Sequence, residues 1–258
     1  MNYFVEGIQG SGKSTLVRRL SERCTNSELY REGDYSPVEL AWCALVSEKE
    51  YEKILSKYSI ISEDIKLHTV SEDNNKVICY TQIITDEPGF HKDLEQYEIY
   101  NGNKDIREFK DIVLRRFVKW NGENQIFECS IFQNIMENLM LYLELSDEEI
   151  IDFYKELAKT IQDKEYKIVY LDVENIRECI EVIKVERSDA AGNELWFPLM
   201  VNYLESSPYS QKRDLKGMEG LVIHLERRRE LEHRIINEIF AKETIIVKAK
   251  EYDIGEIL

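Results

Sequence analysis

Short apolar runs alternate along the chain with longer stretches in which apolar residues recur every three or four positions. The short runs predict strands at Tyr3–Glu6, Glu28–Arg31, Lys76–Thr85, Gln125–Glu128, Tyr166–Val173 and Thr244–Lys248. The longer stretches predict helices at Lys13–Arg23, Val38–Val46, Glu48–Lys57, Ile106–Trp120, Ile131–Leu143, Ser146–Ile161, Ile176–Val185 and Leu221–Phe240. Strands separated by helices pair in parallel, so the pattern predicts an α/β fold with a parallel β-sheet and helices on both faces.

One stretch departs from this alternation. Between residues 35 and 100 the chain is mixed and polar, with no regular succession of strands and helices. A chain of 258 residues can form one large α/β domain or two small ones. With only four prolines and eleven glycines there is little sign of a linker, so we expect a single domain over 1–258 that is enlarged over 35–100.

Composition and charge narrow the function classes. The formal charge is −16, which repels phosphate backbones and argues against nucleic acid as a partner. No stretch approaches the roughly 20 apolar residues of a membrane span, and the first residues do not resemble a signal peptide. The five cysteines form no C-x-x-C pair and the four histidines no metal-ligand spacing. These features predict a cytoplasmic protein without membrane contact, disulfide framework or zinc site.

The strongest motif lies directly after the first predicted strand. The segment Gly-Ile-Gln-Gly-Ser-Gly-Lys-Ser, residues 7–14, fits G-x-x-x-x-G-K-[ST] at every position. Glycines let backbone N–H groups point at a phosphate, Lys13 adds a positive charge, and the Ser14 hydroxyl is suited to Mg²⁺. We therefore expect an ATP-like triphosphate and Mg²⁺ here. The expected binding residues are Gly7, Gln9, Gly10, Ser11, Gly12, Lys13, Ser14 and Thr15.

Further segments carry a resemblance to a known group of enzymes. Tyr-Arg-Glu-Gly-Asp (30–34) follows the second strand, and Ile-Phe-Glu-Cys-Ser (126–130) spans the end of the next core strand. Tyr-Leu-Asp-Val (170–173) ends another strand, and an arginine-bearing polar turn (187–194) is followed by Phe-Pro-Leu (197–199). In these segments and in its glycine motif, the chain resembles the deoxynucleoside kinase and thymidylate kinase group of small-molecule kinases. The likeness covers nearly the whole chain.

The resemblance implies a P-loop NTPase fold of the nucleoside/nucleotide kinase type. It implies a helical lid over 184–198 and an acceptor-side region over 35–100. The expected activity is ATP-dependent transfer of the γ-phosphoryl group to a small-molecule acceptor, with a nucleoside or nucleotide first among the candidates. A homodimer is left open.

Four residues are the catalytic candidates beside Lys13. Glu32 ends the second strand and is the first candidate for the base near the accepting hydroxyl, with Asp34 as the alternative. Glu128 ends a strand in an apolar stretch, where an unpaired carboxylate would be costly, so we expect it to hold Mg²⁺ or to orient the nucleophile. Arg187 lies where a lid could close over the transferring group. Which of the three carboxylates is the base stays open.

The chain departs from the group's pattern at Cys129, where the family carries an arginine. Arg31, Arg115 or Arg116 could replace that cation, and these three are the substrate-binding candidates. The helix that carries Arg115 and Arg116 stands where the deoxynucleoside kinases have a helix facing the base. Arg227-Arg228-Arg229, on a glutamate-rich helix, is predicted to be an exposed, salt-bridged face.

Two alternatives stay open. The enlarged region over 35–100 is compatible with a kinase of the same fold that acts on an antibiotic or another metabolite. The Cys129 departure is compatible with a non-catalytic ATP-binding switch.

Overall fold

The computed structural model describes residues 1–258 and divides into two compact units. The first unit comprises Met1–Leu29 and Asn121–Leu258, and the second comprises Tyr30–Trp120. The sequence pattern predicted one domain enlarged over 35–100, whereas the structure gathers a wider segment into a unit of its own. None of the helices combines the length and the apolar composition that a membrane-spanning helix requires.

The first unit is built on a five-stranded sheet in the order β2-β6-β1-β7-β8. Its strands are β1 (Asn2–Glu6), β2 (Glu28–Tyr30), β6 (Gln125–Glu128), β7 (Tyr166–Asp172) and β8 (Thr244–Lys248). β1 pairs in parallel with β6 and β7, and β7 pairs in parallel with β8. The prediction of an α/β fold with a parallel sheet is confirmed.

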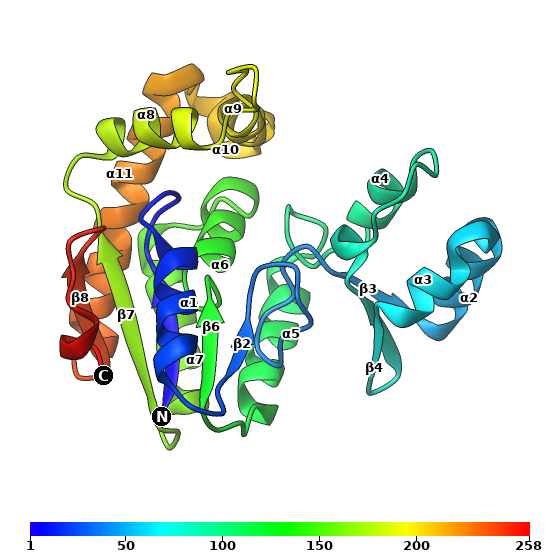
Figure 1. Ribbon diagram of the computed structural model, residues 1–258, viewed down its shortest axis with the longest axis horizontal. Coiled ribbons are helices and arrows are strands. Elements are labelled where there is room, and N and C mark those ends of the chain that lie inside the picture. The colour runs from blue at the N-terminus through cyan, green and yellow to red at the C-terminus, as the bar shows by residue number, and fades with distance from the viewer. The chain divides into compact units, whose positions relative to one another are not determined.

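Helices cover both faces of this sheet (Figure 1). Alternate residues of a strand point to opposite faces. Val5 therefore packs in one buried cluster with Leu16 and Leu20 of the first helix, whereas Phe4 stacks on Phe127 at a ring-centroid distance of 4.7 Å. The helices of this unit are α1 (Lys13–Arg23), α6 (Gln133–Glu137), α7 (Asp147–Ile161), α8 (Ile176–Glu186), α9 (Trp196–Ser206), α10 (Pro208–Arg213) and α11 (Gly217–Ile235). One π-helical turn follows α6 (Asn138–Tyr142) and another follows α11 (Ile236–Phe240).

The second unit has its own sheet and its own core. Its three strands, β3 (Ala44–Ser47), β5 (Asn75–Ile78) and β4 (Thr69–Glu72), pair antiparallel in that order. Its helices are α2 (Glu48–Lys57), α3 (Ser62–Leu67), α4 (Phe90–Glu95) and α5 (Ile106–Lys119). A buried cluster that includes Tyr51, Ile65, Ile78 and Phe90 joins α2, α3, β5 and α4. The unit therefore has a hydrophobic core within one uninterrupted segment.

Two predictions for this segment were wrong. The expected helix over Val38–Val46 is absent, because Trp42 adopts a left-handed backbone conformation (φ 61°) and the chain then enters β3. The strand expected over Lys76–Thr85 ends at Ile78 and continues as a short 3₁₀ turn at Tyr80–Gln82. Apolar runs of this length fit a strand or a buried helix equally well, so their spacing does not decide between them.

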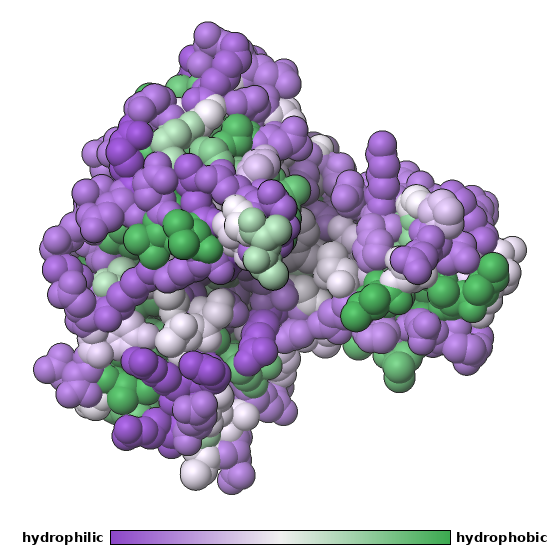
Figure 2. Space-filling view, turned by 45° about the horizontal axis from the view of Figure 1, so that its top comes forward, coloured by the Kyte–Doolittle hydropathy of each residue, from purple (hydrophilic) through white to green (hydrophobic).

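The surface carries apolar side chains in separate patches. Most of the face in Figure 2 is hydrophilic, with smaller hydrophobic areas between the charged side chains. Exposed apolar residues occur in both units, among them Ile60, Leu67, Ile84, Val185 and Leu199. A surface that is mostly hydrophilic agrees with the large excess of acidic residues in the composition.

A buried carboxyl group makes the stability of the second unit depend on pH. Burial raises the pKa of Glu39 to about 8, although Glu39 accepts a hydrogen bond from the Ala41 N–H at 2.6 Å. Because the folded pKa lies above the unfolded value, this group stabilises the fold fully below about pH 4.3, and that stabilisation is lost as pH rises towards 8. We expect Glu39→Gln to remove this part of the pH dependence, at about 1.4 kcal/mol for each unit of pKa difference. Thermal melts of both proteins from pH 5 to 9 provide the measurement, and parallel curves would contradict the expectation.

Candidate functional site

The loop Gly7–Gly12 connects the carboxyl end of β1 to α1 and depends on its glycines. Gly7, Gly10 and Gly12 have φ angles of 135°, 80° and 96°, which side chains disfavour. A Cβ on Gly7 would also lie 2.6 Å from the Leu171 carbonyl oxygen of β7. The loop therefore follows a path, close against the neighbouring strand, that only glycine can take at these positions.

The position of this loop in the sheet is one where open α/β sheets bind ligands. After β1 the chain continues to β2, at one edge of the sheet, and after β7 it continues to β8, at the other edge. β1 and β7 are neighbours, so the two connections diverge at this point. Ligands of open α/β sheets bind beyond the carboxyl ends of the strands at such a point.

The start of α1 offers backbone donors to an anion. Gly12 precedes the helix in a left-handed conformation, and no side chain caps the first turn. The first N–H groups of a helix lack partners within the helix, and the helix dipole favours negative charge there. The buried Ser11 hydroxyl oxygen has no hydrogen-bond partner. An uncapped helix start, a buried unpartnered hydroxyl and a loop of glycines fit a bound phosphate group.

Lys13 folds back onto this loop. Its Nζ donates to the carbonyl oxygens of Gly7 at 2.9 Å and of Ile8 at 2.8 Å. The residue is only 6% exposed. The loop thus holds a positive charge among its own carbonyl groups, directly beside the helix start.

Ser14 and Glu128 come together beside the loop, as the sequence predicted for a shared metal site. The Ser14 hydroxyl donates to Glu128 Oε1 at 2.5 Å, and Glu128 lies opposite Val5 of β1 at the end of β6. Hydroxyl and carboxylate oxygens are ligands that Mg²⁺ accepts. No group of three or more His, Cys, Asp or Glu side chains could hold a metal ion. Mg²⁺ commonly uses one or two protein ligands together with waters and phosphates, so the pair fits that ion.

Cys129 stands where the resemblance placed an arginine, and its side chain is buried. It is 1% exposed and has a left-handed backbone conformation (φ 61°). Its N–H donates to the Val5 carbonyl at 3.1 Å, which prolongs the β1–β6 pairing by one residue. The position therefore contributes no cation to the loop.

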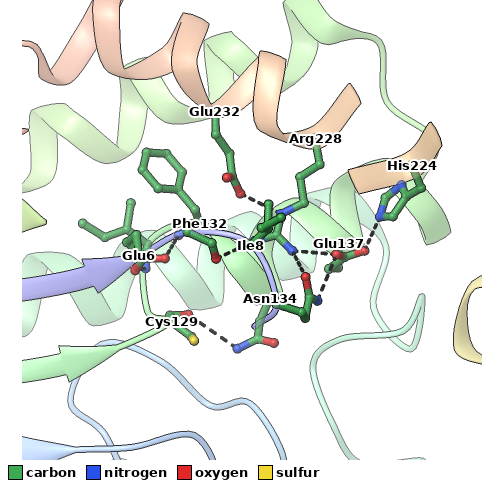
Figure 3. A network of polar contacts seen from close by, with 12 residues as sticks. Glu6, Ile8, Cys129, Phe132, Asn134, Glu137, His224, Arg228 and Glu232 are labelled. Carbon is green, nitrogen blue, oxygen red and sulfur yellow. Dashed lines mark hydrogen bonds and ion pairs between the residues drawn. The ribbon is translucent and has the colours of Figure 1, made fainter. Parts of the chain in front are cut away.

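A network of buried charges lies beside the loop (Figure 3). Arg228 of α11 is fully buried and donates through Nη1 to Glu137 Oε1 at 2.7 Å and to Gln9 Oε1 at 2.9 Å. Its Nε donates to Glu232 at 2.7 Å, and its Nη2 donates to the Gly7 carbonyl oxygen at 3.3 Å. The network connects the loop to α6 and α11.

Two more side chains complete this network. His224 Nε2 lies 2.7 Å from Glu137 Oε2, and the Tyr170 hydroxyl of β7 donates to Glu232 at 2.7 Å. Burial by itself would raise the pKa of Glu137, but His224 and Arg228 bring it down to about 2. Burial would lower the pKa of Arg228, but Glu232 and Glu137 raise it further above its usual range. The Arg228–Glu137 ion pair is therefore charged at neutral pH.

This network was not predicted from the sequence, and its arginine was expected on the surface. Arg227–Arg229 was predicted to be an exposed face, which is wrong for Arg228. Arg227 pairs with Asp147 at 2.7 Å and Arg229 with Asp172 at 2.6 Å, both partly exposed, while Arg228 turns inward. His224, Arg228 and Glu232 recur at a spacing of four residues, so they share a helix face that also carries Leu221 and Leu225. That spacing was the available signal.

A further buried carboxyl group lies at the end of β1. Glu6 accepts hydrogen bonds from the N–H groups of Ile131 at 2.7 Å and Phe132 at 3.1 Å (Figure 3). Burial raises the pKa of Glu6 to about 7 in spite of these two donors. The carboxyl group fixes the start of α6 against the strand that leads into the loop.

Other predicted site residues belong to the second unit. Asp34 accepts from the Arg31 N–H at 2.8 Å and from Gln82 at 2.6 Å. Glu32, in the same turn, acts electrostatically on the buried Glu39. The structure describes this unit by itself, so the roles of Glu32 and Asp34 as base and of Arg31 in substrate binding stay predictions.

Arg115 and Arg116 differ in their surroundings. Arg115 is half exposed and pairs with Asp111 one helical turn earlier. Arg116 is buried, pairs with Glu72, donates to the Ser36 carbonyl and lies over the Tyr35 ring at 5.8 Å. The charge of Arg116 is therefore paired within the second unit. Substrate binding by either arginine stays a prediction.

The predicted lid segment over 184–198 contains Arg187 at the end of α8. Its guanidinium lies 5.9 Å from the Trp196 ring centroid, and the side chain is exposed. Lys184 pairs with Glu194 at 3.3 Å, and Ser188 bridges to Glu194 through the backbone. The segment is a closed turn held at its base, and the catalytic role of Arg187 stays a prediction.

Gly7 provides a direct test of the loop geometry. We expect Gly7→Ala to destabilise the protein by about 1–3 kcal/mol, because the new Cβ meets the Leu171 carbonyl oxygen and the φ angle is unfavourable. Gly192→Ala is the matched control, since Gly192 also has a positive φ (83°) but nothing lies within 4 Å of its Cβ position. Thermal unfolding compares the two variants, and equal losses would contradict the role of the close approach.

Comparisons with known proteins leave this site to be interpreted from its geometry. The chain matches no protein-family model, and it has no match among curated proteins.

Proposed function

We propose that the protein is an ATP-dependent phosphotransferase that moves the γ-phosphoryl group to a small-molecule acceptor. A nucleoside or nucleotide is the first candidate acceptor. The observation that carries the proposal is the glycine loop at the end of β1, which places Lys13 and the Ser14–Glu128 pair at one helix start. The sequence resemblance to the deoxynucleoside and thymidylate kinases supports this choice of reaction.

In this proposal the loop binds the triphosphate through its backbone. N–H groups of the loop and of the first turn of α1 donate to phosphate oxygens. Lys13 exchanges the carbonyl oxygens of Gly7 and Ile8 for phosphate oxygens, which are stronger acceptors because they are charged. Gln9, Gly10, Ser11, Gly12 and Thr15 complete the set of binding residues expected from the sequence.

Ser14 and Glu128 are the residues that would hold Mg²⁺. A bound Mg²⁺ ion neutralises charge that develops on the phosphates. The Ser14 hydroxyl and the Glu128 carboxylate would supply oxygen ligands to the ion, or Glu128 would instead orient the acceptor.

The transfer itself needs alignment more than covalent help. An acceptor oxygen forms a bond to the γ-phosphorus, the bond to the β–γ bridging oxygen breaks, and ADP leaves. The acceptor's proton passes to a carboxylate, for which Glu32, Asp34 and Glu128 are the candidates. Arg187 is the candidate that approaches the transferring group from the lid segment.

A panel of acceptors tests the proposal. The protein is incubated with ATP, Mg²⁺ and one of a series of nucleosides, nucleoside monophosphates and antibiotics, and ADP and the phosphorylated acceptor are measured. We expect ADP to form with at least one nucleoside or nucleotide. Turnover with an antibiotic alone would favour the metabolite-kinase alternative, and no binding of ATP would contradict every version of the proposal.

The buried Cys129 favours a second candidate function, a non-catalytic ATP-binding switch. Its side chain lies in the core at the position where the kinases that the sequence resembles carry an arginine, so this position supplies no positive charge to the phosphates. Tight ATP binding without turnover on any acceptor would support the switch and contradict the kinase.

A further inference from the structure

The carbonyl oxygen of Gly7 is shared by two positive side chains. Lys13 Nζ donates to it at 2.9 Å and Arg228 Nη2 at 3.3 Å. Gly7 is buried, so its carbonyl group depends on protein donors. Lys13 lies at the start of α1 and Arg228 on α11.

The two donors differ in their freedom to move. The ammonium group of Lys13 lies at the end of a flexible side chain and donates only to carbonyl oxygens of the loop. Arg228 is fully buried, and its guanidinium is fixed by Glu137, Glu232 and the Gln9 side chain. If Lys13 turns to a phosphate, the Gly7 carbonyl loses its closer donor and keeps only Arg228.

We propose that Arg228 is a positioning residue of the phosphate loop. Arg228 holds the Gly7 carbonyl and the Gln9 side chain in place, so that Lys13 can exchange the Gly7 carbonyl oxygen for a phosphate oxygen. This inference rests on the proposed function. Without Arg228, release of Lys13 would leave the buried Gly7 carbonyl group unpaired, which is unfavourable. The unpaired carbonyl would lower the affinity for phosphate, because it arises only when Lys13 moves.

The chemistry of arginine fits this task. Its planar guanidinium offers five N–H donors in a fixed fork, whereas a lysine offers one rotating ammonium group. In Arg228 the fork reaches a backbone carbonyl, a side-chain amide and two carboxylates at once. Glu137 and Glu232 balance the charge of Arg228. Arg228 therefore adds contacts to the loop without adding a net positive charge beside it.

The test compares Arg228→Lys with Arg229→Lys. Both changes exchange an ion-paired arginine for lysine on the same helix, but Arg229 pairs with Asp172 and does not contact the loop. Calorimetry measures the affinity of each folded variant for Mg·ATP and for inorganic tripolyphosphate, well below its melting temperature. We expect Arg228→Lys to lose about tenfold or more in affinity for both ligands. Arg229→Lys should stay within about twofold of the wild type.

Equal losses for both ligands place the effect at the phosphates, since tripolyphosphate has no base or sugar. A purely structural role would lower the melting temperature and leave the affinities unchanged, which would overturn the inference. If Arg228→Lys does not fold, Gln9→Met takes its place, because it removes the amide that Arg228 and Glu137 contact. Wild-type affinity in Gln9→Met would then overturn the inference. An equal loss of affinity in Arg229→Lys would also overturn the inference, whereas no binding by the wild type would contradict the proposed function itself.

Discussion

Replacing Lys13 with alanine is expected to reduce the affinity for Mg·ATP by roughly a hundredfold or more. Loss of one partner of a desolvated, hydrogen-bonded charge pair typically costs about 2–5 kcal/mol, and 1.4 kcal/mol corresponds to a factor of ten. Lys13 is buried at the first turn of α1, so water cannot replace its charge at the phosphates. Isothermal titration calorimetry with Mg·ATP gives the measurement.

Lys167→Ala is the control for this experiment. Lys167 also donates to a backbone carbonyl, that of Lys242 at 3.2 Å, but it lies on β7 away from the loop. Its removal should leave the affinity for nucleotide unchanged. Unchanged affinity in Lys13→Ala would contradict the phosphate site and, with it, the kinase proposal.

Glu128→Gln is expected to lower the rate of phosphoryl transfer by about 10²–10³ while ATP still binds. The amide keeps the size of the side chain and can still accept from Ser14, but it carries no charge to hold Mg²⁺. Removing one group that stabilises developing charge commonly has an effect of this size. The rate is measured with the acceptor found in the panel, and the Mg²⁺ dependence of nucleotide binding is measured beside it.

Asp172→Asn is the matched control, because Asp172 also ends a strand of the sheet but pairs with Arg229 and His233. Its transfer rate should stay near that of the wild type. A Glu128→Gln variant with full activity and an unchanged need for Mg²⁺ would exclude Glu128 from the metal site and from the catalytic candidates.

The first unit could be predicted from the sequence because local signals agree with one another there. The helix Ser146–Ile161 was expected from its capping residues, and the structure has both halves of the capping box between Ser146 and Glu149. The bounds of α1 and β6 also match the prediction. In each case apolar spacing, end signals and length all indicate one kind of element.

The small sheet of the second unit was harder to predict because its strands depend on contacts between distant residues, whereas α2 has the predicted bounds Glu48–Lys57. β4 is polar at three of its four positions and β5 at two of its four, and both strands are held by pairing across the small sheet. The buried face of α11 was not predicted either, because it too depends on contacts with distant residues. Whether Arg228 faces solvent or the core depends on Glu137, which lies 91 residues earlier in the chain. A charge cluster in sequence does not indicate which of its members finds a buried partner.

The small antiparallel sheet and its core have a consequence for how new specificities could arise. All of that unit lies in one continuous segment, so only two backbone junctions, at Leu29–Tyr30 and at Trp120–Asn121, connect it to the rest. A chimera that exchanges the whole block needs two splice points and leaves the glycine motif intact. In the proposed kinase, such an exchange would replace the acceptor-side region that the sequence resemblance implies and would leave the proposed phosphate-binding loop unchanged.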